Sequence, residues 1–518
     1  MRGSITSVRR PIAAARIKRM PRPLISFAFP LILAGGLVLN AQDAGLVLRT
    51  SVGYNTQKAS LPLTDEQRKE ADRLGQKAQR AAQARQYGDA MRDYNQGAAI
   101  MRNIPWTPAY ELAVSLQGRL DHAIVEPGKS VSVTLAPLYS DEREQNLKVS
   151  ATVALVPAKE NGSEPATLES GVKLNPAALP FTTRVTLPSS VSGDFNLEVR
   201  LGAEGETPMD GARSAFVKSL PIHIEALSAD AQRLKDKLAK AKQGSPALAT
   251  AEYALVLYEK ADQGEINPAR YNFREQFANA STIIDAVDQG HDPFSGKRGD
   301  FRKAYRSPVD STLQPYRIFI PASYDASKPA PLLVALHGMG GDENSMFDGY
   351  KETLKREAER VGFIVACPKG RDSASMYRGP AEQDVVDVMK EVERDYRIDP
   401  KRVYLMGHSM GGYGTWSVAM DHPDLFAALG PISGGGDVDG MVKIKNIPEY
   451  VVHGNDDHTV NVNQSRRMVE AGKKAGANIT YVEVPGGSHV SVAEPSFAPM
   501  LDFFAKQQRS DSSEVRTQ

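Results

Sequence analysis

The sequence from about residue 300 to residue 507 predicts an α/β fold with a doubly wound sheet. Three observations support this prediction. Six short apolar runs have the length of buried strands, the segments between them have the periodicity of amphipathic helices, and the two patterns alternate along the chain. Such a sheet is parallel and is covered by helices on both faces. Ligands bind at the carboxyl ends of its strands, so the residues directly after each strand are the informative ones.

Each predicted element of this region can be placed on the sequence. Strands are expected at 331–337, 363–367, 403–406, 426–432, 450–453 and 479–484. Amphipathic helices are expected between them, among them 350–361, 381–396 and 462–475. Two loops that carry no decisive chemistry, 371–382 and 434–441, are expected to form walls of a ligand pocket.

Two helical regions and one region of strands precede the α/β region. A helical hairpin is predicted at 60–118, where Thr64 and Gln67 can form a capping box. Short alternations of Val, Thr and Leu at 120–226 predict an immunoglobulin-like β-sandwich. A helical spacer is predicted at 227–290.

Two helices of the spacer have start signals in the sequence. These signals are Ser245-Pro246 and Asn267-Pro268, in which a capping residue is followed by proline at the first helical position. The Gly-, Asp- and Lys-rich stretch at 290–300 marks the boundary with the α/β region, which is assigned to 300–507. The polar tail at 508–518 is expected to be flexible.

The first 44 residues have the layout of a signal peptide. Seven basic residues and no acidic residue precede an uncharged run at 24–39, and cleavage is expected near 41–44. The run is shorter than the roughly 20 residues that span a bilayer. We therefore expect a secreted or periplasmic protein with no stable membrane insertion after cleavage, and an uncleaved N-terminal anchor is the alternative.

Length and charge exclude some classes of function. The chain has 518 residues, enough for about three domains of roughly 150 residues. The chain has 63 Lys and Arg residues and 62 Asp and Glu residues, so its net charge is +1. Such a small charge does not attract nucleic acid electrostatically, and no nucleic-acid partner is expected. Cys367 is the single cysteine, which excludes an internal disulfide and a thiolate metal cluster.

A serine flanked by glycines follows the third predicted strand. The segment reads Gly407-His-Ser409-Met410-Gly411 and is followed by a helical stretch. In a nucleophile elbow the backbone is pinched between strand and helix, so glycine is needed two residues before and two residues after the serine. Gly407 and Gly411 meet this need as the structural elbow. Ser409 is therefore the candidate nucleophile.

A serine hydroxyl is a weak nucleophile unless a base takes its proton, and here the acid and then the histidine are expected to follow the serine. Elimination among the later histidines leaves His489, in the loop after the last strand. In the loop after 450–453, Asp456 and Asp457 compete for the role of the acid. The frequent spacing His-Gly-x-x-Asp favours Asp457, which would hold the imidazole tautomer and stabilise the imidazolium.

Two backbone N–H groups are needed to stabilise the oxyanion of a tetrahedral intermediate. One is expected from Met410, directly after the serine and at a helix N-terminus. The other is expected from Met339, in the glycine-rich loop at 337–341 after the first buried strand. His337 is expected to orient this loop and not to act as a base. The chemistry requires no metal and no cofactor.

Four segments of the catalytic region carry a resemblance to a known group. They are 316–321, 331–338, 399–416 and 453–457. On these segments, residues 300–507 resemble the serine esterases and predicted peptidases of the α/β-hydrolase fold. The group includes the feruloyl and acetylxylan esterases, the polyhydroxyalkanoate depolymerases and relatives of the prolyl oligopeptidase catalytic domain. The resemblance implies Ser409 as nucleophile, Asp457 as acid and His489 as base. One departure is 459–461, Thr-Val-Asn, where relatives often have Val-Pro.

The sequence thus predicts a secreted serine hydrolase that cleaves carboxylic esters through an acyl-enzyme on Ser409. A serine peptidase of prolyl oligopeptidase-like type, acting on short peptides, is one alternative. The other is a binding or scaffold protein in which residues 60–290 are the working part. The expected partners are small-molecule esters, polysaccharide-linked esters or short peptides as substrates.

Overall fold

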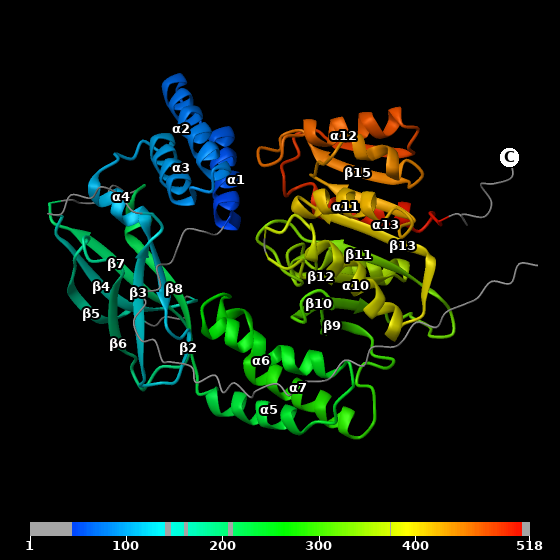
Figure 1. The fold of residues 1–518 in the computed structure, drawn as a ribbon, viewed down its shortest axis with the longest axis horizontal. Coiled ribbons are helices and arrows are strands. Elements are labelled where there is room, and N and C mark those ends of the chain that lie inside the picture. The colour runs from blue at the N-terminus through cyan, green and yellow to red at the C-terminus, as the bar shows by residue number, and fades with distance from the viewer. Residues whose placement is uncertain (1–43, 140–146, 160–163, 206–210, 373, 510–518) are drawn as a thin grey trace, which may run out of the picture. The chain divides into compact units, whose positions relative to one another are not determined.

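The computed structural model describes residues 44–139, 147–159, 164–205, 211–372 and 374–509 (Figure 1). The signal peptide predicted at 1–44 lies outside these residues except for Ala44. The tail predicted at 508–518 lies outside them except for its first two residues. Within the described ranges, no helix combines the length and the apolar character needed to cross a membrane.

Helices open the described part of the chain. They are α1 (Ala44–Ser60), α2 (Asp65–Gln83), α3 (Tyr87–Met101) and α4 (Pro108–Ser115). The capping box expected before α2 is present, because the Gln67 N–H donates to the Thr64 hydroxyl at 3.2 Å and the Thr64 N–H donates to the Gln67 side chain at 3.0 Å. The sequence prediction missed α1, which has little amphipathic periodicity. This helix is fixed to α2 by a 2.7 Å hydrogen bond from the Tyr54 hydroxyl to the carbonyl oxygen of Ala71.

Two sheets form the predicted β-sandwich, with apolar side chains of both packed into one core. One sheet has the order β1-β3-β6 and the other the order β2-β8-β7-β4-β5. Side-chain alternation explains the packing, since Val131, Val133 and Leu135 of β3 are buried and the residues between them are half-buried. The elements are β1 (Leu116–Leu120), β2 (Ile124–Val125), β3 (Ser130–Pro137), β4 (Val149–Pro157), β5 (Ala166–Leu174), β6 (Phe181–Thr186), β7 (Gly193–Ala203), η1 (Arg213–Phe216) and β8 (Val217–Ile224).

The spacer contains helices whose starts differ from the prediction. They are α5 (Ser228–Lys240), α6 (Leu248–Asp262), the 3₁₀ turn η2 (Pro268–Arg270) and α7 (Phe273–Asp288). The predicted start at Ser245 is wrong, because its hydroxyl only accepts the Ala247 N–H and α6 begins later. The predicted start at Asn267 is wrong for α7, because extended backbone at Tyr271 ends the short turn. A second cap at Asn272 then starts α7 by accepting the N–H of the third helical residue.

An eight-stranded mixed sheet forms the centre of the α/β region. Its order is β16-β15-β14-β13-β11-β12-β10-β9. The strands are β9 (Gly299–Arg306), β10 (Leu313–Ile320), β11 (Ala330–Leu336), β12 (Ile364–Pro368), β13 (Ile398–His408), β14 (Ala428–Ile432), β15 (Glu449–Gly454) and β16 (Ile479–Val484). The six predicted strands, β11 to β16, run parallel. The expectation of an entirely parallel sheet is wrong at one edge, because β10 pairs antiparallel with both β9 and β12.

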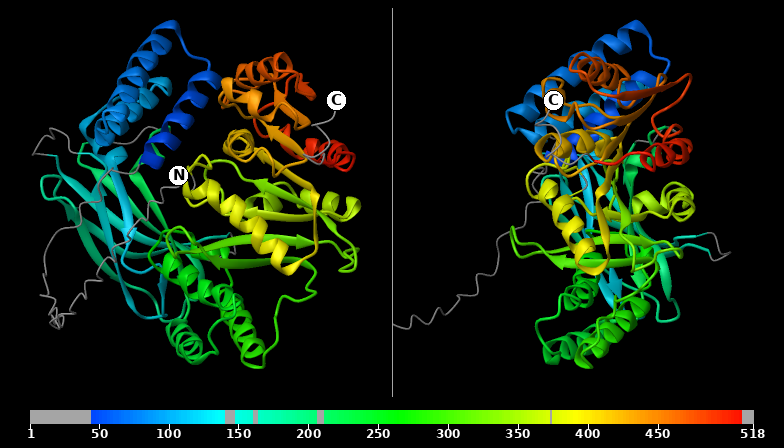
Figure 2. Two further views of the ribbon diagram at one scale, coloured as in Figure 1. Left: turned by 45° about the vertical axis from the view of Figure 1, so that its right-hand side comes forward. Right: turned by 90° about the vertical axis from the view of Figure 1, so that its right-hand side faces the viewer.

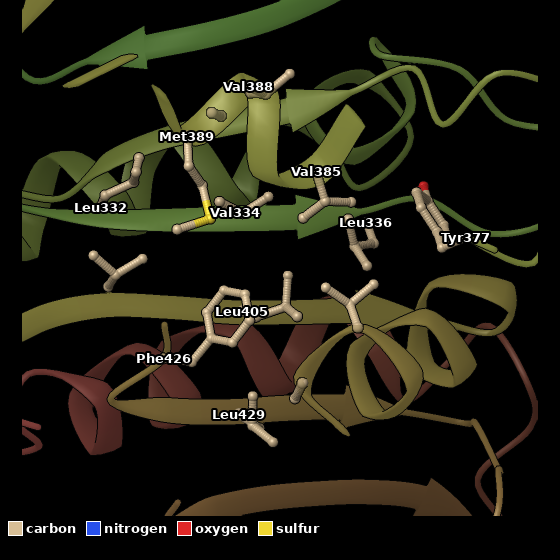
Figure 3. Close-up of a cluster of buried hydrophobic side chains, with 14 of the residues drawn as sticks. Leu332, Val334, Leu336, Tyr377, Val385, Val388, Met389, Leu405, Phe426 and Leu429 are labelled. Carbon is tan, nitrogen blue, oxygen red and sulfur yellow. The ribbon is translucent and has the colours of Figure 1, made fainter. Parts of the chain in front are cut away.

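Helices cover both faces of this sheet, so the predicted α/β fold class is confirmed (Figure 2). They are α8 (Ser345–Asp348), α9 (Thr353–Val361), α10 (Pro380–Asp395), α11 (Met410–Asp421), η3 (Asp439–Ile444), α12 (Asn463–Lys474) and α13 (Ala493–Phe504). In β11, Leu332, Val334 and Leu336 face α10 and its Val385 and Met389 (Figure 3). The residues between them face the opposite core, which includes α9 and α13. Because alternate residues of β11 are buried in the cores on the two faces of the sheet, every position of the strand is apolar, and its sequence is a continuous apolar run.

One carboxyl group is buried inside this region, at the start of β15. Glu449 is fully buried, and its Oε2 accepts a hydrogen bond from Trp416 Nε1 at 2.8 Å. Its Oε1 has no hydrogen-bond partner among the residues that the structure describes. Burial raises the pKa of Glu449 to about 7, and the hydrogen bond from Trp416 opposes this rise only in part. The folded protein therefore keeps a proton that the unfolded chain releases above about pH 4.3.

Replacing Glu449 with glutamine is expected to flatten the pH dependence of stability. The pKa of Glu449 is higher in the folded protein than in the unfolded chain, so its protonated form stabilises the fold at low pH. As the pH rises from about 4.3 to about 7, the free energy of unfolding falls by up to about 1.4 kcal/mol per pH unit. The amide resembles the protonated acid at every pH. The Glu449→Gln variant should therefore melt close to wild type at pH 5 and several degrees above it at pH 8.

Tryptophan fluorescence can follow this unfolding within the α/β region. The chain has two tryptophans, so a Trp106→Phe background leaves Trp416, the donor to Glu449, as the reporter. Equal pH dependence of the melting temperature in wild type and Glu449→Gln would contradict the assignment of this proton.

Candidate active site

Ser409 lies at the sharp bend between β13 and α11. Its backbone has φ of 59° and ψ of −118°, a conformation that is costly for a residue with a side chain. The flanking glycines explain how the bend is accommodated. A Cβ at Gly407 would lie 2.3 Å from the carbonyl oxygen of Gly411, and a Cβ at Gly411 would lie 2.2 Å from that of Leu336. Neither position has room for any side chain, so both glycines are required for the strand and helix to meet.

The structure brings the three sequence-predicted side chains into one hydrogen-bonded row. His489 Nε2 lies 2.9 Å from Ser409 Oγ, and His489 Nδ1 lies 2.7 Å from Asp457 Oδ2. A carboxylate only accepts hydrogen bonds, so Nδ1 carries the proton and the Nε2 lone pair faces the serine hydroxyl. The residues follow β13, β15 and β16, and thus meet at the carboxyl edge of the sheet.

Asp457 is held ionised and in one orientation. Its side chain is fully buried, and its Oδ1 accepts the N–H groups of Thr459 and Val460, each at 2.8 Å. Burial raises the pKa of Asp457. Hydrogen bonds from His453 and His489 lower it, as do the charge of His489 and the backbone hydrogen bond from Val460. Together these outweigh burial and hold the pKa well below its usual range. The carboxylate therefore stays charged throughout the neutral range.

Asp456, the competing candidate for the acid, points elsewhere. Its side chain is 61% exposed and pairs with His458 at 3.3 Å, and its N–H donates to the carbonyl oxygen of Gly487. The geometry therefore joins Asp457, not Asp456, to the histidine. Asp457 also caps the turn that follows it through the two backbone N–H groups that its Oδ1 accepts.

Two further residues that sequence reasoning missed fix the loop that carries His489. His408 Nε2 lies 2.8 Å from the carbonyl oxygen of His489, and His408 Nδ1 lies 2.8 Å from the Tyr350 hydroxyl. Burial lowers the pKa of His408 to about 4, so its ring is neutral, donates from Nε2 and accepts from Tyr350. Tyr350 is 58 positions away from its partner, and no spacing pattern could have indicated it.

Both segments expected to supply oxyanion donors lie beside the serine. Met410 is the first residue of α11, so its N–H is one of the donors that a helix leaves unpaired. The loop that contains Met339 runs past the nucleophile, because a Cβ at Gly338 would lie 3.4 Å from Ser409 Cβ. His337 Nδ1 and Nε2 lie 2.8 and 2.7 Å from backbone carbonyl oxygens of this loop and of the segment after β12.

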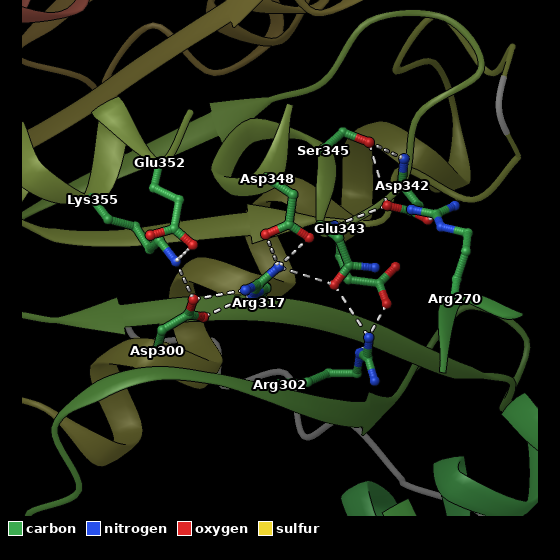
Figure 4. A network of polar contacts seen from close by, with 11 residues as sticks. Arg270, Asp300, Arg302, Arg317, Asp342, Glu343, Ser345, Asp348, Glu352 and Lys355 are labelled. Carbon is green, nitrogen blue, oxygen red and sulfur yellow. Dashed lines mark hydrogen bonds and ion pairs between the residues drawn. The ribbon is translucent and has the colours of Figure 1, made fainter. Parts of the chain in front are cut away.

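A network of ion pairs fixes the residues that follow this loop (Figure 4). Arg270 pairs with Asp342 at 3.0 Å, and Arg302 pairs with Glu343 at 3.0 Å. The Ser345 hydroxyl accepts the N–H of Asp342 at 2.9 Å. The network holds the chain between β11 and α8, so the glycine-rich loop before it is anchored at both ends.

Comparisons with known proteins point to one group of enzymes. The model of the prolyl oligopeptidase family matches residues 377–450, which include Ser409 but not Asp457 or His489. A bifunctional acetylxylan esterase/xylanase of Neocallimastix patriciarum is 32% identical over 151 residues, which cover 28% of this chain and 22% of that protein. A probable feruloyl esterase C of Aspergillus oryzae is 29% identical over 185 residues, 34% of this chain and 68% of that protein. The resemblance to the α/β-hydrolase serine esterases is confirmed.

Solved structures of esterases are also similar to this chain. A thermostable esterase covers 74% of this chain with 18% identity and a TM-score of 0.38. A ferulic acid esterase of Anaeromyces mucronatus, solved with ferulic acid, covers 40% of this chain with 17% identity and a TM-score of 0.35. The chain spans about a fifth of the length of the Neocallimastix relative and about two thirds of the Aspergillus relative.

Proposed function

We propose that this protein hydrolyses carboxylic esters through an acyl-enzyme on Ser409. The observation that carries the proposal is the continuous hydrogen-bonded row from Ser409 through His489 to Asp457. A hydroxyl at a strained bend, a base whose lone pair faces it and a buried carboxylate behind the base are the parts that nucleophilic acyl transfer requires.

The first half of the proposed reaction forms the acyl-enzyme. His489 Nε2 takes the proton as Ser409 Oγ attacks the ester carbonyl carbon, and Asp457 stabilises the imidazolium through Nδ1–H. The negative charge that develops on the carbonyl oxygen is stabilised by the N–H groups of Met410 and Met339. His489 then gives its proton to the leaving alcohol as the C–O bond breaks.

The second half releases the acid. Water attacks the acyl carbon, His489 accepts one proton of that water, and Ser409 leaves as the proton returns to its oxygen. None of these steps calls for a metal or a cofactor. The names of the relatives favour acyl groups such as acetyl and feruloyl, carried on small molecules or on polysaccharides.

The second candidate function is a serine peptidase that acts on short peptides. The match of residues 377–450 to the prolyl oligopeptidase family favours it. Amide cleavage uses the same nucleophile and base but needs stronger protonation of the leaving amine, which His489 would supply. The two candidates therefore differ in substrate and not in machinery.

A fluorophosphonate label on the purified chain tests the shared mechanism. One covalent adduct is expected, on the peptide that contains Ser409, and a lack of adduct on that peptide would contradict both enzymatic candidates and favour the binding or scaffold alternative. Rates on a short-chain p-nitrophenyl ester, a feruloyl ester and a peptide anilide then separate the two. Hydrolysis of the anilide above both esters would contradict the esterase proposal.

We also propose that the protein is exported. The proposal is supported by the basic stretch and the uncharged run in residues 1–44. Expression of the full sequence in a bacterial host, followed by N-terminal sequencing of the periplasmic fraction, is expected to give a mature chain that begins near 41–44. Retention of the uncleaved chain in the membrane fraction would support the anchor alternative.

A further inference from the structure

A second histidine lies against the carboxylate of the proposed triad. His453 is the fifth residue of β15 and is fully buried. Its Nε2 lies 3.2 Å from Asp457 Oδ2 and 2.9 Å from the carbonyl oxygen of Val460. Its Nδ1 lies 2.7 Å from Ser465 Oγ. Asp457 Oδ2 therefore lies between two imidazole rings, those of His453 and His489.

The partners of His453 determine where its protons lie. Both atoms that face Nε2 are acceptors, one a carboxylate and one a carbonyl oxygen, so Nε2 must carry a proton. The Ser465 hydroxyl has a single proton, and it lies 3.0 Å from the carbonyl oxygen of Gly434, which can only accept. When the serine donates to Gly434, it accepts from His453, which places a proton on Nδ1 as well.

We propose that His453 is a cationic positioning residue that forms a buried ion pair with the proposed catalytic acid. A ring with protons on both nitrogens is the one form that satisfies every partner. A buried imidazolium needs a counter-charge, and Asp457 supplies it at hydrogen-bonding distance. This inference rests on the proposed function, because it assigns the second partner of the triad carboxylate.

The ion pair has a consequence for the base. Asp457 shares its negative charge between His453 and His489, so it attracts the proton of His489 less strongly than an unshared carboxylate would. Among the described residues, other titratable or charged groups around this cluster include His408 of β13, Tyr413 of α11, Arg466 of α12, Glu483 of β16 and the exposed pair of Asp456 and His458. Arg466 and Glu483 pair with each other, and Glu483 is bonded to the Tyr481 hydroxyl, so Asp457 is the carboxylate that directly pairs with His453.

Nitrogen NMR of the full chain tests the charge state directly. The nine histidines are labelled with ¹⁵N, and the signals of His453 are assigned by their loss in His453→Gln. At pH 7.5 both ring nitrogens of His453 are expected to show directly bonded protons. An unprotonated ring nitrogen on His453 at this pH would overturn the proposal. This readout does not depend on activity, so it remains decisive even if the fluorophosphonate label fails.

The pH profile tests the effect on the base. His453→Gln keeps a donor toward Val460 but removes the charge, so the acidic limb of kcat/KM is expected to move up by about one pH unit. The matched control is His223→Gln, which removes a histidine paired with Asp194 and Glu225 in the β-sandwich. The control should leave the limb in place. An unmoved limb in folded His453→Gln would overturn the proposal.

A second variant covers the case in which His453→Gln does not fold. Ser465→Ala removes the acceptor of the Nδ1 proton and leaves the histidine in place, so His453 is expected to lose that proton and become neutral. The acidic limb should then move in the same direction, and one ring nitrogen should appear unprotonated. A ring that stays doubly protonated with an unmoved limb would contradict the role given to Ser465.

Discussion

Replacing Ser409 with alanine is expected to lower kcat for ester hydrolysis by about 10⁵- to 10⁶-fold. The variant loses the oxygen that attacks the carbonyl, and His489 Nε2 is left without its 2.9 Å partner. The residual rate should still exceed that in water, because the oxyanion donors and the binding surface remain. The measurement is kcat on a p-nitrophenyl ester, with labelling by fluorophosphonate in parallel.

The control for this variant lies on the same helix. Ser417→Ala removes a hydroxyl whose hydrogen bond goes to the carbonyl oxygen of Gly414, within α11. We expect kcat of this control within about twofold of wild type, because the lost hydrogen bond lies within the helix and involves none of the three proposed catalytic side chains. If Ser409→Ala kept more than a hundredth of wild-type kcat while remaining folded, Ser409 would not be the nucleophile.

Replacing Asp457 with asparagine is expected to lower kcat by about 10⁴-fold. An amide nitrogen at the position of Oδ2 would donate toward His489 Nδ1 and favour the tautomer with its proton on Nε2. That proton would face the serine hydroxyl, and the base would have no lone pair to accept with. The measurement is kcat at saturating ester between pH 7 and pH 9.

Asp456 provides the matched control for this loss. Asp456→Asn changes the neighbouring residue by the same atoms, but its exposed side chain pairs with His458 and is not bonded to the base. The expected change in kcat is less than threefold. A larger loss for Asp456→Asn than for Asp457→Asn would reverse the assignment of the acid and would also remove the basis for the ion pair with His453.

Local patterns predicted the parts of the site that local sterics control. The strand-to-helix bend needs glycine at Gly407 and Gly411, and such a need leaves a mark within five residues of sequence. Chain order and the position of loops after strands were enough to indicate His489. Chain order alone did not separate the two aspartates after β15, because the side-chain directions of adjacent loop residues depend on the path of the backbone. The spacing His-Gly-x-x-Asp favoured Asp457, and the geometry joins that residue to His489.

Contacts between distant segments were beyond the reach of such patterns. The bond between Tyr350 and His408 and the bond between His453 and Ser465 join residues whose types are common and whose spacing carries no signal. In the fold, β9 escaped detection because Arg302 and Lys303 interrupt it. Their charges are compensated by Glu343 and Asp395, which come from far along the chain.

The three proposed catalytic residues follow β13, β15 and β16, which belong to one sheet. The sheet therefore holds these residues in place independently of the loops that connect its strands. The segment 434–447, with exposed Val438 and Val442, carries none of the three. Laboratory evolution could therefore randomise these two exposed positions while the attacking oxygen and its base keep their places. The surface chemistry at these positions would in this way become an engineering variable that is separate from turnover.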